Sequence, residues 1–229
     1  MSEKNNNLAF VFPGQGSQSI GMLTELAESF PEVNQIFDTA SEVLGKDLWN
    51  LVSNGPAEEL NQTYNTQPAM LAAGVSVWQV WCKKSSTRPG WMAGHSLGEY
   101  TALVCSGALS FTDAIALVAE RGRLMQEAVP VGTGAMAAIL GLNDDQVASV
   151  CAEAADGEVV SPVNFNAPGQ VVIAGNISAV ERAMVAAKDA GAKRAVKLPV
   201  SVPSHCALMK PAAEKLDGQM EKIHFDQPD

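Results

Sequence analysis

Apolar positions along the chain fall into runs that predict a mixture of strands and helices. A continuous apolar run at Leu8–Phe12 is typical of a buried parallel strand, and a second, short apolar run at Trp91–Ala93 predicts another strand. Apolar residues at helical spacing predict helices over residues 20–30, 32–44 and 67–84, with a loop over 85–90. These elements indicate an α/β domain.

From residue 134 the pattern changes to a compact alternation of short elements. It predicts a strand, a helix, two strands, a helix and a last strand, over residues 135–140, 144–155, 159–165, 171–174, 178–190 and 193–198. Ser178 and Glu181 have the spacing of a capping box at the start of the second helix. The order β-α-β-β-α-β is that of a split βαβ unit, a ferredoxin-like module. We place this module at residues 128–201, inserted between residues 1–127 and 202–229 of a larger α/β domain.

Composition and charge narrow the classes of protein. The chain has 229 residues, of which 47% are hydrophobic and 17% charged, enough apolar material for a folded core. Its net charge of −10 argues against general nucleic-acid binding, which needs a broad basic face. No apolar run is long enough for a signal peptide or a membrane span. Four cysteines without metal-ligand or redox spacing suit a reducing compartment, so we expect a cytoplasmic protein with no metal site.

The turn Gly94-His95-Ser96-Leu97-Gly98 matches the G-x-S-x-G nucleophile elbow. A short apolar strand precedes it and a helix through Val104 follows, which is the context that the motif requires. Such a turn exposes the Ser96 hydroxyl at its tip and leaves the Leu97 N–H available to an oxyanion. The structural alternative is a tight turn whose serine only caps the helix.

A serine nucleophile needs a base, and the chain offers His95, His205 and His224. His95 precedes the nucleophile, so its ring should point away from the hydroxyl, and His224 lies in a polar segment that suits a solvated side chain. His205 follows a loop at the start of a helix that Ser204 begins, from which it can reach across a cleft. A histidine bonded locally at a helix start is the alternative. Since no Asp or Glu stands alone at a strand end between Ser96 and His205, a Ser–His dyad with a neutral orienting acceptor fits better than a full triad.

Arg121 is the most informative single charge. It lies in the apolar stripe of a helix over residues 112–127, at three- and four-residue spacing from Leu117, Val118, Leu124 and Met125. A guanidinium in such a stripe needs a partner, because an unpaired buried charge is costly. The carboxylate of a substrate would be such a partner, and a structural ion pair or a snorkelling side chain is the alternative.

The loop after the first strand, Pro13–Gln18, contains two glycines and two glutamines. Gln15 could donate to an oxyanion if the first strand lies beside the strand of the elbow. The loop lacks the third glycine of a dinucleotide fingerprint and the lysine of a P-loop, so a nucleotide site is a poor interpretation.

Three motifs together resemble the bacterial malonyl-CoA:acyl-carrier-protein transacylases of type II fatty acid synthesis. They are Phe10-Val11-Phe12-Pro13-Gly14-Gln15-Gly16-Ser17-Gln18, Gly94-His95-Ser96-Leu97-Gly98-Glu99-Tyr100 and Ser201-Val202-Pro203-Ser204-His205-Cys206-Ala207-Leu208-Met209. The resemblance runs from about residue 8 to Asp229. It implies an α/β-hydrolase-like parallel-sheet core with an inserted ferredoxin-like subdomain.

The resemblance also implies a role for each candidate residue. Ser96 corresponds to the malonylated nucleophile and His205 to its general base and acid. Gln15 and the Leu97 amide correspond to the oxyanion hole, and Arg121 to the residue that pairs with the free malonyl carboxylate. The implied reaction moves a malonyl group from malonyl-CoA to the phosphopantetheine thiol of acyl carrier protein by a ping-pong mechanism. It needs no cofactor besides the malonyl-CoA substrate.

The resemblance raises further expectations about docking, length and assembly. Carrier proteins of the family are acidic like this chain, so docking needs a local basic patch, either Lys188, Lys193, Arg194 and Lys197 or Lys210 and Lys215. The family's chains continue beyond a segment like His224–Asp229, so we expect a chain truncated at its C-terminus, and we expect a monomer. A serine thioesterase or esterase, and a truncated inactive chain that only binds carrier protein or CoA, are the competing functions.

Overall fold

The computed structural model describes residues 3–130, 132–200 and 202–228. Ser201, the first residue of the third motif, lies outside the described residues. The chain divides into two compact units, one made of Met1–Gly122 and Gly218–Asp229 and the other of Arg123–Asp217. The predicted boundaries at residues 128 and 201 stay a prediction.

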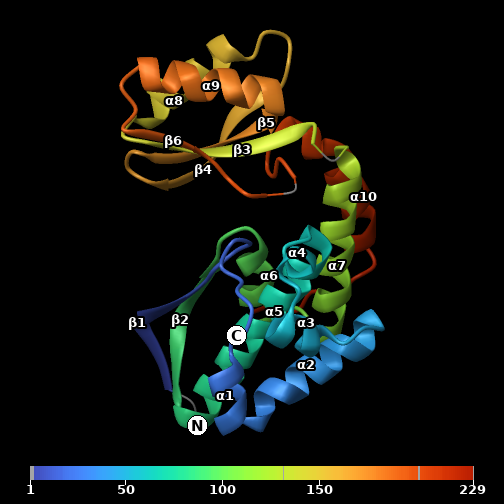
Figure 1. The fold of residues 1–229 in the computed structure, drawn as a ribbon. Coiled ribbons are helices and arrows are strands. Elements are labelled where there is room, and N and C mark those ends of the chain that lie inside the picture. The colour runs from blue at the N-terminus through green and yellow to red at the C-terminus, as the bar shows by residue number, and fades with distance from the viewer. Residues whose placement is uncertain (1–2, 131, 201, 229) are drawn as a thin grey trace. The chain divides into compact units, whose positions relative to one another are not determined.

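The first unit contains two parallel strands with helices packed on one side of them (Figure 1). Strands β1 (Glu3–Phe12) and β2 (Thr87–Gly94) pair so that Phe12 lies opposite Gly94, and both therefore end at the same edge. The helices of this unit are α1 (Thr24–Ser29), α2 (Pro31–Leu44), α3 (Leu48–Asn54), α4 (Ala57–Leu60), α5 (Thr63–Lys84), α6 (Leu97–Cys105) and the first part of α7 (Phe111–Ala128). The predicted mixed α/β class is confirmed.

Four elements of this unit begin several residues away from the predicted start. Strand β1 begins at Glu3 instead of Leu8, and α1 begins at Thr24 instead of Ile20. Helix α5 begins at Thr63, four residues before the predicted start, because Pro68 lies inside the helix and polar residues build its first turn. The Thr66 hydroxyl donates to the Leu60 carbonyl over 2.6 Å in that turn. Strand β2 begins at Thr87, within the predicted loop, because the backbone of residues 87–89 pairs with β1 although their side chains are not apolar in pattern.

The expectation that Leu8–Phe12 forms a fully buried strand is wrong for the part of the chain that the structure describes. Phe12 is 6% exposed and belongs to the main core, and Phe10 packs edge-on against Trp78 and Trp81 of α5. Val11, on the opposite face, is 73% exposed. Helix α5 thus covers one face of the strand, and among the described residues no element buries Val11.

The second unit contains the predicted alternation of strands and helices. Its elements are β3 (Gly134–Leu140), α8 (Asp144–Ala154), β4 (Val160–Ala167), β5 (Gln170–Asn176), α9 (Ile177–Asp189), β6 (Arg194–Lys197), the short 3₁₀ helix η1 (Ala207–Met209) and α10 (Lys210–Met220). The four strands form an antiparallel sheet in the order β4-β5-β3-β6. Helices α8 and α9 lie on one face of this sheet and bury small and β-branched residues such as Ala137, Ile139 and Ile173 against it (Figure 1).

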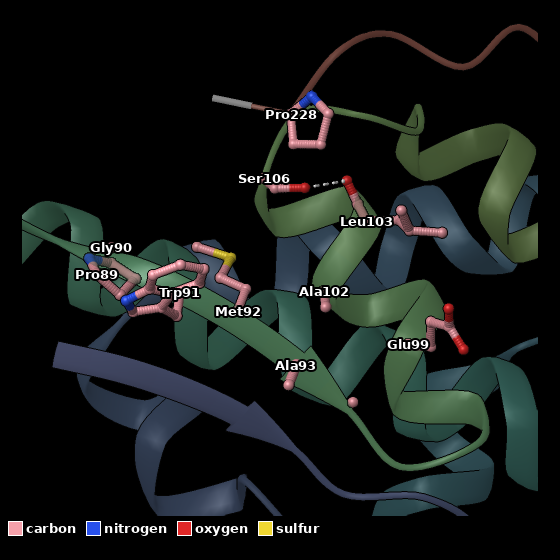
Figure 2. A pocket seen from close by; sticks show the side chains of 11 residues that line it. Pro89, Gly90, Trp91, Met92, Ala93, Glu99, Ala102, Leu103, Ser106 and Pro228 are labelled. Atoms are coloured by element: carbon pink, nitrogen blue, oxygen red, sulfur yellow. Dashed lines mark hydrogen bonds between the residues drawn. The ribbon is translucent and has the colours of Figure 1, made fainter. Parts of the chain in front are cut away.

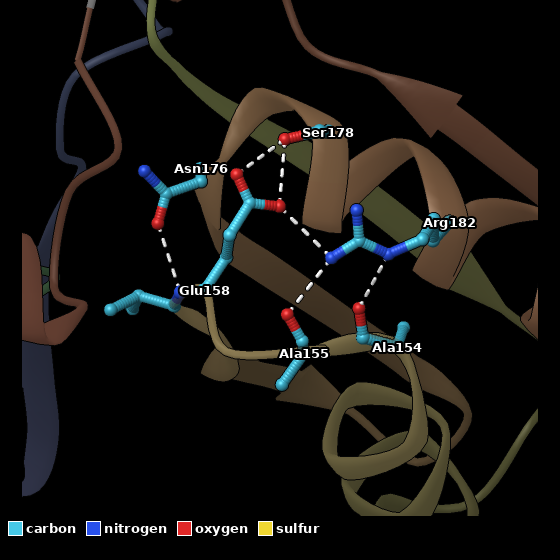
Figure 3. A network of polar contacts seen from close by, with 7 residues as sticks. Ala154, Ala155, Glu158, Asn176, Ser178 and Arg182 are labelled. Carbon is cyan, nitrogen blue, oxygen red and sulfur yellow. Dashed lines mark hydrogen bonds and ion pairs between the residues drawn. The ribbon is translucent and has the colours of Figure 1, made fainter.

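The predicted capping box at the start of α9 is wrong. Asn176 is the residue that precedes the helix, and Ser178 lies within its first turn. The Ser178 hydroxyl donates to the Glu158 carboxylate instead, 2.7 Å from both oxygens (Figure 3). Glu181 pairs with Lys197. A tertiary partner for the serine thus replaces the local cap.

Glu158 also ties α8 to α9 through Arg182. The guanidinium of Arg182 donates to Glu158 Oε2 over 2.9 Å and to the carbonyls of Ala154 and Ala155 at the end of α8 (Figure 3). The hydrogen bond from Ser178 and the pairing with Arg182 lower the pKa of Glu158. This cluster satisfies carbonyls that the end of a helix leaves without an intrahelical partner.

Candidate active site

Ser96 occupies a strained position between β2 and α6. Its backbone has φ 54° and ψ −105°, a combination that residues other than glycine seldom adopt. Strain of this kind costs on the order of 1–3 kcal/mol and is concentrated at functional sites. The geometry is that of a nucleophile elbow, in which the turn holds the serine hydroxyl at its tip.

The two glycines of the motif allow the strand and the helix to meet backbone to backbone. A Cβ at Gly94 would lie 1.8 Å from the carbonyl carbon of Gly98, and a Cβ at Gly98 would lie 2.1 Å from the carbonyl oxygen of Phe12. Any side chain at either position would therefore collide with main-chain atoms, which have little room to shift. The sequence needs glycine at both flanks, as the motif predicted.

The loop after β1 passes directly beside the elbow. The His95 N–H donates to the Phe12 carbonyl over 3.0 Å, and a Cβ at Gly14 would lie 2.6 Å from the His95 carbonyl oxygen. The condition set for Gln15, that the first strand lies beside the elbow strand, is therefore met. His95 itself is exposed.

Side chains of this loop anchor it to the start of α5. Gln15 Nε2 donates to Thr63 Oγ1 over 3.2 Å, and Gln18 Nε2 donates to Asn61 Oδ1 over 2.8 Å. Gln18 Oε1 in turn accepts from the Gly16 N–H. These bonds hold Gln15 half-buried in the same unit as Ser96.

The backbone N–H of Leu97 is a second candidate donor for an oxyanion. Leu97 is the first residue of α6, and within the described residues its N–H has no hydrogen-bond acceptor. The first N–H groups of a helix lack intrahelical partners and carry the positive end of the helix dipole. Gln15 and Leu97 therefore supply two different donors from segments that meet at the elbow.

Arg121 is directed at the Ser96 hydroxyl. Its Nη2 donates to Ser96 Oγ over 3.1 Å, its Nη1 donates to Gln67 Oε1 over 2.7 Å, and its guanidinium carbon lies 5.6 Å from the centre of the Tyr100 ring. Among the residues that the structure describes, no carboxylate pairs with it. The structural ion pair considered for Arg121 is therefore not found.

Burial shifts the pKa values of Arg121 and of the neighbouring Tyr100. Removal from water lowers the pKa of its guanidinium, and the nearby Tyr100 and Glu99 offset part of that effect. Burial likewise raises the pKa of the Tyr100 hydroxyl, against the attraction of Arg121. An arginine stays protonated in proteins, so a positive charge without a carboxylate partner lies next to the serine hydroxyl.

His205 lies in the second unit, in the turn before η1. It is exposed and has φ 67°, a left-handed conformation that holds its backbone in a tight turn. The helix predicted to begin at Ser204 begins instead at Ala207, because Cys206 has extended backbone angles. The neighbouring Cys206 thiol is buried and donates to the Pro203 carbonyl, and burial raises its pKa, which disfavours a reactive thiolate.

Gln67 and Tyr100 are site residues that the sequence analysis missed. Gln67 stands in a polar stretch before the apolar part of α5, where no spacing signal distinguishes it from its neighbours. Tyr100 lies in the first turn of α6, four residues after Ser96, but Ser96 precedes that helix with non-helical backbone angles. The helix period therefore could not have identified either residue, because each reaches Arg121 from a different segment of the chain.

A separate hollow of about 660 Å³ lies beside β2 and α6 (Figure 2). Pro89–Gly94 of the strand, Glu99, Ala102, Leu103 and Ser106 of the helix, and Pro228 line it. Ser106 uses its hydroxyl locally, donating to the Leu103 carbonyl over 3.1 Å. None of the candidate residues Ser96, Gln15 or Arg121 lines this hollow.

Among the described residues, no group of His, Cys, Asp and Glu is arranged to hold a metal ion, and no helix is long and apolar enough to cross a membrane. The six basic residues named as a candidate patch are exposed, and two of them are paired, Lys197 with Glu181 and Lys210 with Glu214.

Comparison with known proteins places this geometry in a family. The model of the acyl transferase domain family matches residues 9–229. The malonyl CoA-acyl carrier protein transacylases of Salmonella typhimurium and Escherichia coli are each 63% identical to the chain over 220 residues, which are 96% of this chain and 71% of theirs. The corresponding enzyme of Bacillus subtilis strain 168 is 51% identical over 212 residues, 92% of this chain and 67% of that protein.

Solved structures agree with the sequence comparison. An acyl carrier protein S-malonyltransferase from Vibrio cholerae has a TM-score of 0.92 at 63% identity, over 96% of this chain and 72% of that one. A malonyl-transacylase solved in complex with a type II polyketide synthase acyl-carrier protein has a TM-score of 0.95 at 63% identity, over 96% of this chain and 71% of that one. The chain belongs to the malonyl CoA-acyl carrier protein transacylase family of acyl transferases.

Proposed function

We propose that the chain transfers a malonyl group from malonyl-CoA to the phosphopantetheine thiol of acyl carrier protein. The observation that carries this proposal is the Arg121 guanidinium 3.1 Å from Ser96 Oγ, without a carboxylate partner among the described residues. A malonyl thioester has a free carboxylate close to its reacting carbonyl, so one ligand can meet both groups. Relatives that are 63% identical are named for this transfer.

The reaction proceeds in two halves. Ser96 Oγ attacks the thioester carbonyl carbon while His205 takes the hydroxyl proton, and the C–S bond then breaks as His205 returns the proton to the departing CoA sulfur. The product of the first half is a malonyl-serine ester. In the second half the carrier thiol gives its proton to His205 and attacks the ester, and Ser96 regains the proton as it leaves.

The oxyanion of each tetrahedral intermediate needs donors that are already in place. The Leu97 N–H and the Gln15 side chain supply them in this proposal. Their support is that β1 and β2 end together, which brings the Gln15 loop to the start of α6. Donors of this kind are worth about 3–4 kcal/mol of transition-state stabilisation each.

We also propose that the fold combines an α/β-hydrolase-like core with a ferredoxin-like subdomain. The first unit is part of an α/β-hydrolase-like core, and the sheet order β4-β5-β3-β6 with helices α8 and α9 supports a ferredoxin-like subdomain at residues 128–201. Residues 1–127 and 202–229 belong to the core in this proposal.

The partners follow from the proposed transfer. One relative was solved in complex with an acyl-carrier protein. Lys188, Lys193 and Arg194 are exposed and have no ion pair among the described residues, so they suit an acidic carrier better than Lys197 and Lys210, which are paired. We propose that the chain works as a cytoplasmic monomer and needs no cofactor besides malonyl-CoA, since a serine and a histidine suffice for the chemistry.

Mass spectrometry of the protein after incubation with malonyl-CoA tests the function. We expect a malonyl adduct on the peptide that contains Ser96, and we expect holo acyl carrier protein to remove it. A protein that shows no adduct would be a binding protein only. An adduct that water discharges as fast as the carrier does would make the chain a thioesterase instead.

A further inference from the structure

Arg121 is held by a neutral group rather than by an acid. Its Nη1 lies 2.7 Å from Oε1 of Gln67, which is fully buried on α5, and its Nη2 lies 3.1 Å from Ser96 Oγ. We propose that Gln67 is a positioning residue that fixes the Arg121 guanidinium at the nucleophile and leaves its charge free for the carboxylate of an acyl group. This inference rests on the proposed function.

The scaffold around Gln67 is rigid where the contact is made. A Cβ at Gly122, the residue after Arg121, would lie 2.7 Å from the Thr63 carbonyl and 2.6 Å from the Tyr64 Cα. Helix α7 therefore meets the first turn of α5 backbone to backbone, one residue from the arginine and one turn from Gln67. This close approach fixes the separation between the two side chains.

The identity of the acceptor decides the charge of the site. An amide oxygen accepts one N–H of the guanidinium and leaves its net charge at +1. A carboxylate in the same place would form a charge-assisted pair and neutralise it, which removes the attraction for an anionic ligand. An apolar side chain there would leave the charge but lose the hydrogen bond that orients it.

The guanidinium retains donors for a ligand in this arrangement. It has five N–H groups, and Gln67 and Ser96 accept from two of its nitrogens. The Tyr100 ring covers it at 5.6 Å and does not compete as an anion. Gln67 thus contributes to the choice between acyl groups with and without an acid, although we do not place it in contact with substrate.

The test compares Gln67→Glu with Gln67→Met and with Gln79→Glu as the matched control. Gln79 is exposed on the same helix, about 18 Å further along its axis, so it receives the same chemical change away from the site. For each protein, the rate of Ser96 acylation is measured against the concentration of malonyl-CoA and of acetyl-CoA. Thermal unfolding of each variant is followed in parallel.

We expect Gln67→Glu to lower the malonyl-to-acetyl ratio of kcat/KM at least about tenfold, mainly through a higher KM for malonyl-CoA. Gln67→Met should lower the ratio less, because the charge remains, and Gln79→Glu should match the unmodified protein. If Gln67 had a merely structural role, kcat/KM would fall equally for malonyl-CoA and acetyl-CoA, and their ratio would stay unchanged.

The outcomes separate this inference from the proposed function. An unmodified protein that is not acylated by malonyl-CoA would overturn the function, and the positioning role with it. An unmodified protein that is acylated, together with an unchanged ratio in both Gln67 variants, would overturn the positioning role alone. If Gln67→Glu does not fold, the malonyl-to-acetyl ratio of kcat/KM for Gln67→Met decides instead. Calorimetry of malonate and acetate binding to Gln67→Met gives a second measurement.

Discussion

Arg121 donates a hydrogen bond from Nη2 to Ser96 Oγ over 3.1 Å, which joins a half-buried cation to the serine of the elbow. The two residues are 25 positions apart, Ser96 in the turn before α6 and Arg121 in α7, so the contact is a product of the fold. A cation at this place can bind the acid of an acyl group while the serine reacts with its thioester. In the proposed function, substrate choice and bond formation depend on this one pair of side chains.

Replacing Arg121 should change the substrate preference. We expect Arg121→Ala to lower kcat/KM for malonyl-CoA on the order of a hundredfold, because a buried charge pair with the substrate is lost. The preference should shift toward acetyl-CoA, which has no acid to pair. Arg123→Ala, on the exposed side of the same helix, is the control. A transacylation assay in which Arg121→Ala discriminates as the unmodified protein does would defeat the assignment.

Replacing His205 should remove the proton transfer and leave acyl-CoA binding in place. We expect His205→Asn to slow acylation of Ser96 by about 10²–10⁴, the usual range for general acid–base catalysis. His224→Asn is the control, because His224 is exposed and contacts Asp226 within its own segment. Single-turnover mass spectrometry measures the rate. Equal rates for the two variants would exclude His205 as the base.

The backbone strain at Ser96 should be measurable as stability. Glycine adopts φ 54° without the Cβ penalty, so we expect Ser96→Gly to be about 1 kcal/mol more stable than Ser96→Ala. Both variants lose the hydroxyl and its bond to Arg121, so the difference between them isolates the strain. Denaturant unfolding measures it. A less stable glycine variant would show that the turn is not strained at this residue.

A methyl group at Gly98 should disrupt the elbow. Its Cβ would lie 2.1 Å from the Phe12 carbonyl oxygen, so we expect Gly98→Ala to lower the free energy of unfolding by at least ~3 kcal/mol. The control is Gly218→Ala in α10, where a Cβ would meet nothing within 4 Å, and we expect a gain of ~0.5–1 kcal/mol there. Similar unfolding curves for the two variants would contradict this view of the turn.

The Glu158 cluster should make stability depend on pH in the acid range. Because the pKa of Glu158 is lowered in the folded state, its stabilising contribution is complete above the ordinary carboxyl pKa of 4.5. It should be lost as pH falls through the lower, folded-state pKa. We therefore expect Glu158→Gln to reduce Tm at neutral pH and to differ less and less from the unmodified protein below about pH 4.5. Glu28→Gln, an exposed carboxylate on α1, should show no such trend.

Much of the site was predictable because its residues follow local rules. The elbow needs glycines at fixed spacing around the serine, and the helix period alone places Arg121 in an apolar stripe. Gln67 could not be found in this way, because its role depends on α5 meeting α7 at Gly122. The same limit applies to Ser178, whose spacing fits a cap but whose partner, Glu158, comes from another segment.

The fold was predictable in its order and less so in its boundaries. Apolar periodicity located most strands and helices. Pro68 suggested that a helix begins at Gln67, but α5 begins one turn earlier with polar residues, at Thr63. The apolar run at Leu8–Phe12 suggested burial of both strand faces, although Val11 is 73% exposed. The apolar pattern shows which residues of a segment can be buried. Whether they are buried depends on segments from elsewhere in the chain that pack against them.

Main-chain contacts at Gly14, Gly94 and Gly98 bring the first two strands close to the turn and the helix that starts at Leu97. Apolar side chains further along that helix can therefore vary in size without carrying the serine hydroxyl with them. Substitutions among the buried apolar residues can therefore leave the position of the Ser96 hydroxyl unchanged. An engineer could redesign the buried residues of this unit for heat resistance and leave the reacting oxygen where it is.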